Sequence, residues 1–208
     1  MIGLESIIPF FIASLLLALA PGPDNIFVLT QSAVNGKKAG VAVTFGLCTG
    51  VIFHTTAVAL GIAVFIQNSA VAFSALKFLG AGYLVYLAWQ AYRTSSSVDL
   101  TADPLQLSLR KLYFRGIFMN VTNPKVSLFF LAFLPQFADP ARGPVGVQIF
   151  ILGSLFILAA IPVFGSIALL SGSIGEILTK SPRVNKILNR VAGTVFLALA
   201  VKLAVTER

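Results

Sequence analysis

A chain of 208 residues with a mean hydropathy of +0.93 holds too few polar residues for a water-soluble fold. Charged residues make up 11% of it and hydrophobic residues 57%, whereas soluble domains carry about 25% charged residues. The formal net charge of +8 is dispersed over several short segments, which argues against a nucleic-acid-binding surface. Composition therefore predicts an integral membrane protein that is surrounded by lipid and has no nucleic-acid partner.

Six apolar stretches are long enough to cross a hydrocarbon core of about 30 Å, which takes about 20 helical residues. The largest polar connector covers residues 94–111 and links two three-helix halves, residues 1–93 and 112–208, of one membrane domain. The expected spans are Ile7–Val34, Ala39–Ile66, Ala70–Tyr92, Phe114–Phe137, Val145–Ser173 and Ile187–Val205.

Lysine and arginine gather in the connectors that follow spans one, three and five. Because cytoplasmic loops are enriched in these residues, the three connectors are expected in the cytoplasm and both termini in the periplasm. An odd number of spans in each half makes the two halves run in opposite directions. The predicted fold is an all-α integral membrane protein, with six transmembrane helices arranged as two inverted three-helix repeats.

Short proline-containing sequences interrupt the first span of each half: Pro21-Gly22-Pro23-Asp24 in the first and Asn123-Pro124-Lys125 in the second. Proline removes a backbone donor and clashes with the preceding turn, so each span should split into two half-helices. Broken spans in corresponding positions of two halves point to a substrate site near the bilayer midplane. Helices 1 and 4 are therefore predicted to be broken, and the protein to be a small transporter.

Each break also contains residues suited to the start of a new half-helix. Asp24 or Asn25 is expected to cap the first, whereas Asn123 suits the cap and Pro124 the first helical position of the second. Lys125 is costly inside a membrane and needs an anionic partner, either Asp24 or the substrate. The alternative interpretations are a surface turn for the first sequence and an interfacial turn with a snorkelling lysine for the second.

Few other residues suggest chemistry. His54 is the only histidine, and it either titrates with the transported ion or bonds to a neighbouring helix. Gly46 and Gly50 have the spacing of close helix packing, which is more often found within one subunit; a homodimer is left open. The single cysteine, Cys48, argues against a thiol relay, and one histidine, one cysteine and two methionines argue against metal efflux. No catalytic motif of a membrane enzyme occurs.

Three sequences in chain order carry a family resemblance: Pro21-Gly22-Pro23, the run from Lys77 to Leu84, and the run from Gly116 to Lys125. Together with the length, they resemble the LysE/RhtB family of bacterial amino-acid exporters, in its threonine, homoserine and leucine branch. The resemblance implies a secondary exporter of the bacterial inner membrane, not an enzyme, which needs no cofactor and uses a proton as the coupling ion.

The candidate site follows from the breaks. We expect the carboxylate of a zwitterionic amino acid to face Lys125 and its ammonium to face Asp24, which would alternate between protonated and paired states. This favours a neutral amino acid; a basic amino acid or another small solute is the alternative. The polar residues Gln90 and Thr122 are further candidate contacts. The predicted substrate- and ion-binding residues are Pro21, Gly22, Pro23, Asp24, Asn25, Asn120, Asn123, Pro124, Lys125 and His54, with no metal ligands and no catalytic residues.

Overall fold

Helices make up the computed structural model, which describes residues 2–62, 70–93, 107–171 and 182–205, and no strand occurs in these ranges. Apolar residues dominate every long helix, as the composition predicts. The elements are α1 (Leu4–Leu19), α2 (Pro23–Asn35), α3 (Lys37–Ala57) with η1 (Val58–Ile62), α5 (Ala70–Arg93), α6 (Leu109–Val121), α7 (Pro124–Leu128) with η2 (Phe129–Phe133) and η3 (Leu134–Phe137), η4 (Pro140–Arg142), α8 (Val145–Leu169) and α10 (Pro182–Val205).

Within the described ranges, two continuous helices, Lys37–Gly61 and Val145–Leu169, are long and apolar enough to cross a membrane, and two bent helix pairs raise the number to four if each pair is one span. α5 and α10, each 24 residues long, coincide with the expected third and sixth spans but are not among these helices. At 1.5 Å per residue each measures about 36 Å, more than the hydrocarbon core. Residues 63–66 and 172–173 of the expected spans, and residues 94–106 of the expected connector, lie outside the described ranges.

The two predicted breaks are confirmed. α1 and α2 meet at an angle of 55°, and α6 meets the helical segment Pro124–Phe137 at 50°. Each second half-helix begins with proline, Pro23 in α2 and Pro124 in α7, where the missing N–H costs nothing. Gly22 precedes α2 in an extended conformation.

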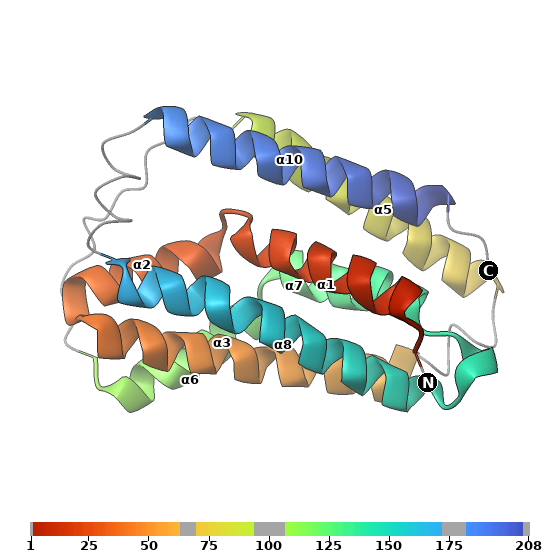
Figure 1. The fold of residues 1–208 in the computed structure, drawn as a ribbon, viewed down its shortest axis with the longest axis horizontal. Helices are drawn as coiled ribbons and strands as arrows, with labels where there is room; N and C mark the ends of the chain where they lie inside the picture. The colour runs from red at the N-terminus through yellow and green to blue at the C-terminus, as the bar shows by residue number, and fades with distance from the viewer. Residues whose placement is uncertain (1, 63–69, 94–106, 172–181, 206–208) are drawn as a thin grey trace.

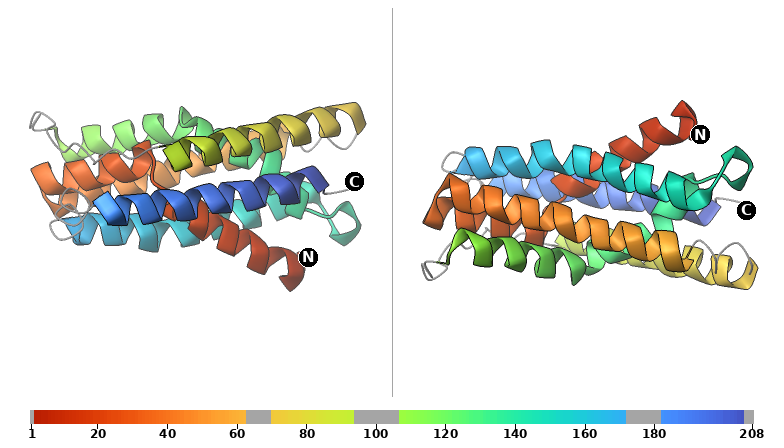
Figure 2. Two further views of the ribbon diagram at one scale, coloured as in Figure 1. Left: turned by 90° about the horizontal axis from the view of Figure 1, so that it is seen from above. Right: turned by 90° about the horizontal axis from the view of Figure 1, so that it is seen from below.

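Successive long helices, with each bent pair taken together, run in alternating directions, and the start of α1 and the end of α10 lie at the same end of the bundle (Figure 1). α5 and α10 pack side by side along one edge, α3 packs against both α6 and α8 along the other, and α1 and α7 lie between them. Figure 2 shows α1 crossing the bundle obliquely, with its N-terminal end leaning away from the other helices. The breaks therefore lie between the α5–α10 pair and the α3–α6–α8 layer.

Glycines bring α3 and α6 into close contact. A Cβ atom on Gly46 would collide with the backbone carbonyl of Tyr113, and one on Gly116 would lie 2.6 Å from the carbonyl oxygen of Val43. The predicted packing role of the glycine spacing within one subunit is confirmed. Gly50, one turn further along α3, gives the same room to the side chain of Asn120, which is thereby placed beside the first break.

A cluster of phenylalanines supports the second break from behind. The rings of Phe129 and Phe133 lie 4.9 Å apart, Phe130 packs edge-on at 5.0 Å against Phe156 of α8, and Phe10 of α1 lies 5.9 Å from Phe129. All five side chains are buried. Aromatic pairs in this geometry add about 0.5–1.5 kcal/mol beyond their buried area, so the half-helix that follows Lys125 is held firmly in place.

Candidate functional site

The second break starts a half-helix as predicted. Asn123 is its N-cap, and the side-chain oxygen accepts the backbone N–H of Lys125 at 3.0 Å. The Lys125 side chain is only 7% exposed, and its ammonium donates to the backbone carbonyls of Ala20 at 2.9 Å and Leu17 at 3.3 Å. The alternative of a lysine reaching the membrane interface is therefore wrong.

The partner of Lys125 is a helix end. Leu17 and Ala20 lie at the C-terminus of α1, where the last carbonyls have no intrahelical donor and the helix dipole is negative. No ion pair joins Lys125 to Asp24 in the described part of the chain. Of the two anionic partners expected from the sequence, Asp24 is thus not the one in this structure, because the broken helix offers unpaired carbonyl oxygens nearer to the ammonium.

At the first break, the residue that caps the second half-helix is not one of the two predicted. Gly22 is the N-cap of α2, and neither Asp24 nor Asn25 caps that helix, which corrects the expectation. Asn25 turns back and donates its amide to the carbonyl of Ala18 at 2.8 Å, satisfying a third carbonyl oxygen at the end of α1. A Cβ atom on Gly22 would lie 2.9 Å from the Lys125 ammonium nitrogen, so the glycine leaves the room that the lysine occupies.

Asp24 lies behind the break in a chain of buried polar groups. It is 2% exposed, so the alternative of a surface turn is wrong. One carboxylate oxygen accepts the amide of Asn120 at 3.3 Å, and the other has no hydrogen-bond partner. His54 Nε2 donates to the backbone carbonyl of Asn120 at 3.1 Å, which confirms the predicted bond to a neighbouring helix. These contacts join α2, α6 and α3.

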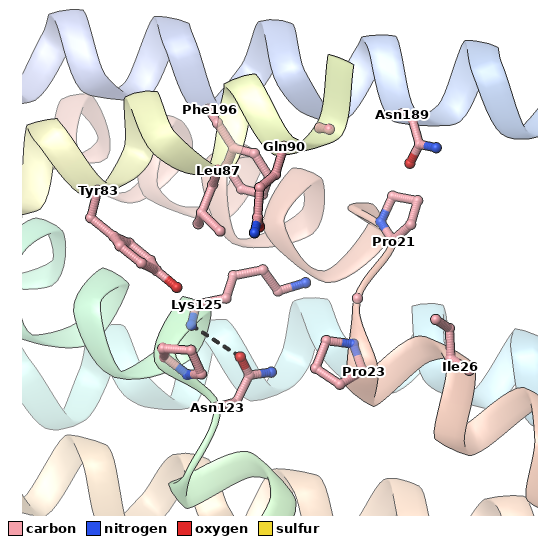
Figure 3. A pocket seen from close by; sticks show the side chains of 13 residues that line it. Pro21, Pro23, Ile26, Tyr83, Leu87, Gln90, Asn123, Lys125, Asn189 and Phe196 are labelled. Carbon is pink, nitrogen blue, oxygen red and sulfur yellow. Dashed lines mark hydrogen bonds between the residues drawn. The ribbon is translucent and has the colours of Figure 1, made fainter. Parts of the chain in front are cut away.

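A cavity of about 440 Å³ opens between the two breaks and the α5–α10 pair. Figure 3 shows the Lys125 side chain crossing it, with Tyr83 and Gln90 reaching in from α5 and Asn189 from α10. The volume lies in the range of small-molecule sites, about 300–1,000 Å³. The lining residues are Pro21, Gly22, Pro23, Ile26, Tyr83, Leu87, Gln90, Ala91, Asn123, Pro124, Lys125, Asn189 and Phe196.

Six of the ten predicted site residues line this cavity, and four do not. Asp24, Asn25, Asn120 and His54 belong to the polar groups behind it. Tyr83, Leu87 and Phe196 were not predicted as site residues, because the sequence of an unbroken apolar helix does not indicate which of its side chains face a cavity. Gln90, predicted as a polar contact, lines the cavity, and Asn189 in the last span offered the same polar signal.

Comparisons with known proteins identify the family of this chain. The family model of the LysE type translocator matches residues 15–207. A homoserine/homoserine lactone efflux protein of Salmonella typhimurium is 35% identical over 94% of both chains. A leucine efflux protein of Salmonella choleraesuis is 27% identical over 95% of this chain and 94% of its own length. The uncharacterized membrane protein YrhP of Bacillus subtilis is also 27% identical, over 96% of this chain and 98% of its own length. No solved structure matches. The chain belongs to the LysE type translocator family.

Proposed function

We propose that this protein exports neutral amino acids across the bacterial inner membrane. The observation that carries the proposal is the buried ammonium of Lys125 on the wall of a 440 Å³ cavity between two broken helices. An ammonium has three donors, and two of them bond to backbone carbonyls, so one is left for a substrate carboxylate. Relatives named for the efflux of homoserine and leucine support the choice of substrate.

The same proposal includes alternating access by two inverted three-helix repeats. The similar bends of 55° and 50° in the first span of each half support the repeat, as does the alternating direction of the spans. In such transporters the site lies between the repeats and is opened first to one side and then to the other. We place both termini in the periplasm because α3 begins with Lys37 and Lys38, α5 ends with Arg93, and these two helix ends lie at the opposite end of the bundle from the start of α1.

Proton antiport is proposed to run through Asp24. Its carboxylate is buried and has one unpaired oxygen, a costly arrangement that protonation relieves. Asp24 lies behind the cavity wall, so the proton and the substrate would bind at separate positions. Both positions adjoin the first break, so a change in the break caused by proton binding would alter substrate binding, and the reverse. A proton entering from the periplasm would favour the state that releases substrate there.

A basic amino acid is the alternative substrate. Its additional cation would require an anionic group on the cavity wall, and no acidic side chain lines the cavity in the described part of the chain. The wall instead offers apolar contacts from Ile26, Leu87 and Phe196. A neutral apolar or hydroxylated side chain fits these surroundings better.

The test is release of labelled leucine, threonine, homoserine, lysine and arginine from preloaded proteoliposomes, with and without an acidic outer buffer. Wild-type protein is expected to release a neutral amino acid faster when the outer buffer is acidic. Asp24→Asn keeps an oxygen for the Asn120 amide and should abolish the response to the gradient while exchange of labelled for unlabelled substrate continues. Asp139→Asn, at the exposed start of η4, is the control and should behave like wild type. Absence of release of every amino acid from folded protein would contradict the proposed function.

A further inference from the structure

The second break offers hydrogen-bond donors to the cavity. Lys125 has a third ammonium proton beyond its two bonds to backbone carbonyls. The side-chain amide nitrogen of Asn123 is buried and has no hydrogen-bond partner in the described part of the chain. Such donors bind a carbonyl oxygen, whether it belongs to a carboxylate, an ester or an amide. The amine of a substrate needs an acceptor, which has to come from another part of the wall.

The acceptor for the amine is a neutral group. Asp24, which the sequence suggested as the partner of the substrate ammonium, does not line the cavity and bonds to Asn120 instead. No acidic side chain lines the cavity among the described residues. Opposite the break, α5 and α10 contribute three polar side chains to the wall: Tyr83, Gln90 and Asn189.

The hydroxyl of Tyr83 is the one of these three groups that makes no hydrogen bond within the described part of the chain. Gln90 donates its amide to the hydroxyl of Tyr86 at 2.7 Å, and Asn189 has an interaction of its own. The ring of Tyr83 lies 5.9 Å from that of Tyr86. Figure 3 shows it reaching from α5 toward the break that carries Lys125, with the hydroxyl at its tip. A phenol oxygen can accept a hydrogen bond from an ammonium.

The positive charge of the amine makes this contact strong although the tyrosine is neutral. A hydrogen bond in which one partner is charged changes affinity by about 10- to 150-fold. Leu87, one turn further along α5, and Phe196 of α10 line the same wall and offer no acceptor. An ammonium that gives up water to enter these surroundings therefore depends on the hydroxyl of Tyr83.

We infer that Tyr83 determines specificity for the substrate amine. Its hydroxyl oxygen accepts a hydrogen bond from the ammonium, while Lys125 donates to a carbonyl oxygen of the same molecule. The inference rests on the proposed function, because it uses the same cavity and the same lysine. It goes beyond that function in assigning the amine to a residue of an unbroken helix in place of Asp24. The compounds selected are those with an α-amine beside a carbonyl group, of which the free amino acid is one.

The test is exchange in proteoliposomes without a proton gradient, which measures binding and translocation apart from coupling. Unlabelled leucine, leucinamide and 4-methylpentanoate compete with labelled leucine, in the wild type and in Tyr83→Phe. Leucinamide keeps the amine without the carboxylate, and 4-methylpentanoate keeps the carboxylate without the amine. Threonine, threoninamide and 3-hydroxybutanoate are tested in parallel against labelled threonine.

Tyr83→Phe removes the hydroxyl and keeps the ring. It should raise half-saturation for leucine and the inhibition constant of leucinamide by about tenfold or more, at an unchanged maximal rate. The inhibition constant of 4-methylpentanoate should stay within about twofold of the wild-type value, because this compound has no amine. The variant should unfold at the wild-type temperature, since the lost hydroxyl has no hydrogen-bond partner in the described part of the chain.

Tyr92→Phe, on the same helix, is the matched control. Its hydroxyl lies 2.8 Å from that of Thr194 on α10 and does not line the cavity, so half-saturation should stay unchanged. If Tyr83→Phe exchanges leucine and threonine with wild-type half-saturation, the inference is overturned and the proposed function stands. An equal loss for all three compounds of a series would also overturn it, because Tyr83 would then act on the shape of the cavity. If the wild type exchanges neither amino acid, the proposed function itself fails.

Discussion

The Lys125 ammonium donates to the carbonyl oxygen of Ala20 across 2.9 Å, and this bond joins the second break of the chain to the first. Each partner supplies what the other lacks. The end of α1 has carbonyls without intrahelical donors and a negative dipole end, and the lysine has a positive charge that makes no ion pair in the described part of the chain. A substrate carboxylate that draws the ammonium toward itself would loosen this bond, so substrate binding and the angle between the half-helices are linked.

Gly22→Ala tests how closely the lysine is fitted to the break. The new Cβ would lie 2.9 Å from the Lys125 nitrogen, the mobile end of a long side chain, so the ammonium should move while the fold persists. The extended backbone at Gly22 accepts alanine without strain. We expect half-saturation for export to rise by about tenfold, which corresponds to roughly 1.4 kcal/mol, as measured by concentration-dependent release.

Gly165→Ala in α8 is the matched control, because nothing lies within 4 Å of the position of its Cβ. It should leave half-saturation unchanged and raise stability slightly, since alanine is favoured over glycine inside a helix by about 0.5–1 kcal/mol. Unchanged half-saturation in Gly22→Ala would show that the ammonium position is not set by the room at the glycine.

Lys125→Arg should impair export although the charge is kept. A guanidinium is planar and larger than an ammonium, and the space beside Gly22 is fitted to the smaller group. We expect folded protein with exchange reduced by more than about tenfold. Combining the substitution with Gly22→Ala should give no further loss, because both changes displace the same group; additive losses in a double-mutant cycle would contradict this explanation.

Gly116→Ala should lower stability without a direct effect on the cavity. Its Cβ would lie 2.6 Å from the Val43 carbonyl, and the neighbouring backbone of α3 has no side chain that can turn aside. Overpacking of this kind costs about 1–3 kcal/mol, which thermal unfolding in detergent would measure. Since the contact lies within one chain, the oligomeric state should not change. A loss of oligomer with unchanged unfolding would instead place the glycine in a subunit interface.

The sequence predicted the broken helices because proline acts locally, whatever surrounds it. Pro23 and Pro124 start half-helices in the structure for the reason that their position in the sequence suggests. The partner of Lys125 was not predictable in this way. It depends on where α1 ends relative to a residue about one hundred positions later, and the carbonyl groups that receive the ammonium belong to the backbone. No residue type marks such a partner.

The same limit applies to the cavity. Phe196 and Leu87 lie on helices that carry apolar residues on both the exposed and the buried face, so periodicity does not separate the two faces. Asn189 is easier to recognise from the sequence as a candidate site residue, because a buried amide in an apolar span needs a polar neighbour. Polar residues in otherwise apolar spans are thus the best sequence signal for a cavity wall built by unbroken helices.

Substitutions at His54 test whether this residue has a structural role or takes part in ion coupling. Its Nε2 donates to the Asn120 carbonyl, and its ring packs 5.7 Å from that of Phe130, but it does not line the cavity. His54→Gln retains an N–H donor and removes the ability to take up a proton near neutral pH. If the histidine only holds α3 to α6, this variant should keep gradient-driven export. His54→Leu should lose about 0.5–1.5 kcal/mol of stability, because it removes one of the two hydrogen bonds that the Asn120 carbonyl accepts, the other coming from the backbone N–H of Asn123. Both variants are compared by proteoliposome release and by thermal unfolding. Export that is lost in His54→Gln while unfolding stays at the wild-type temperature would assign the proton to His54 and remove the need for Asp24 as its carrier.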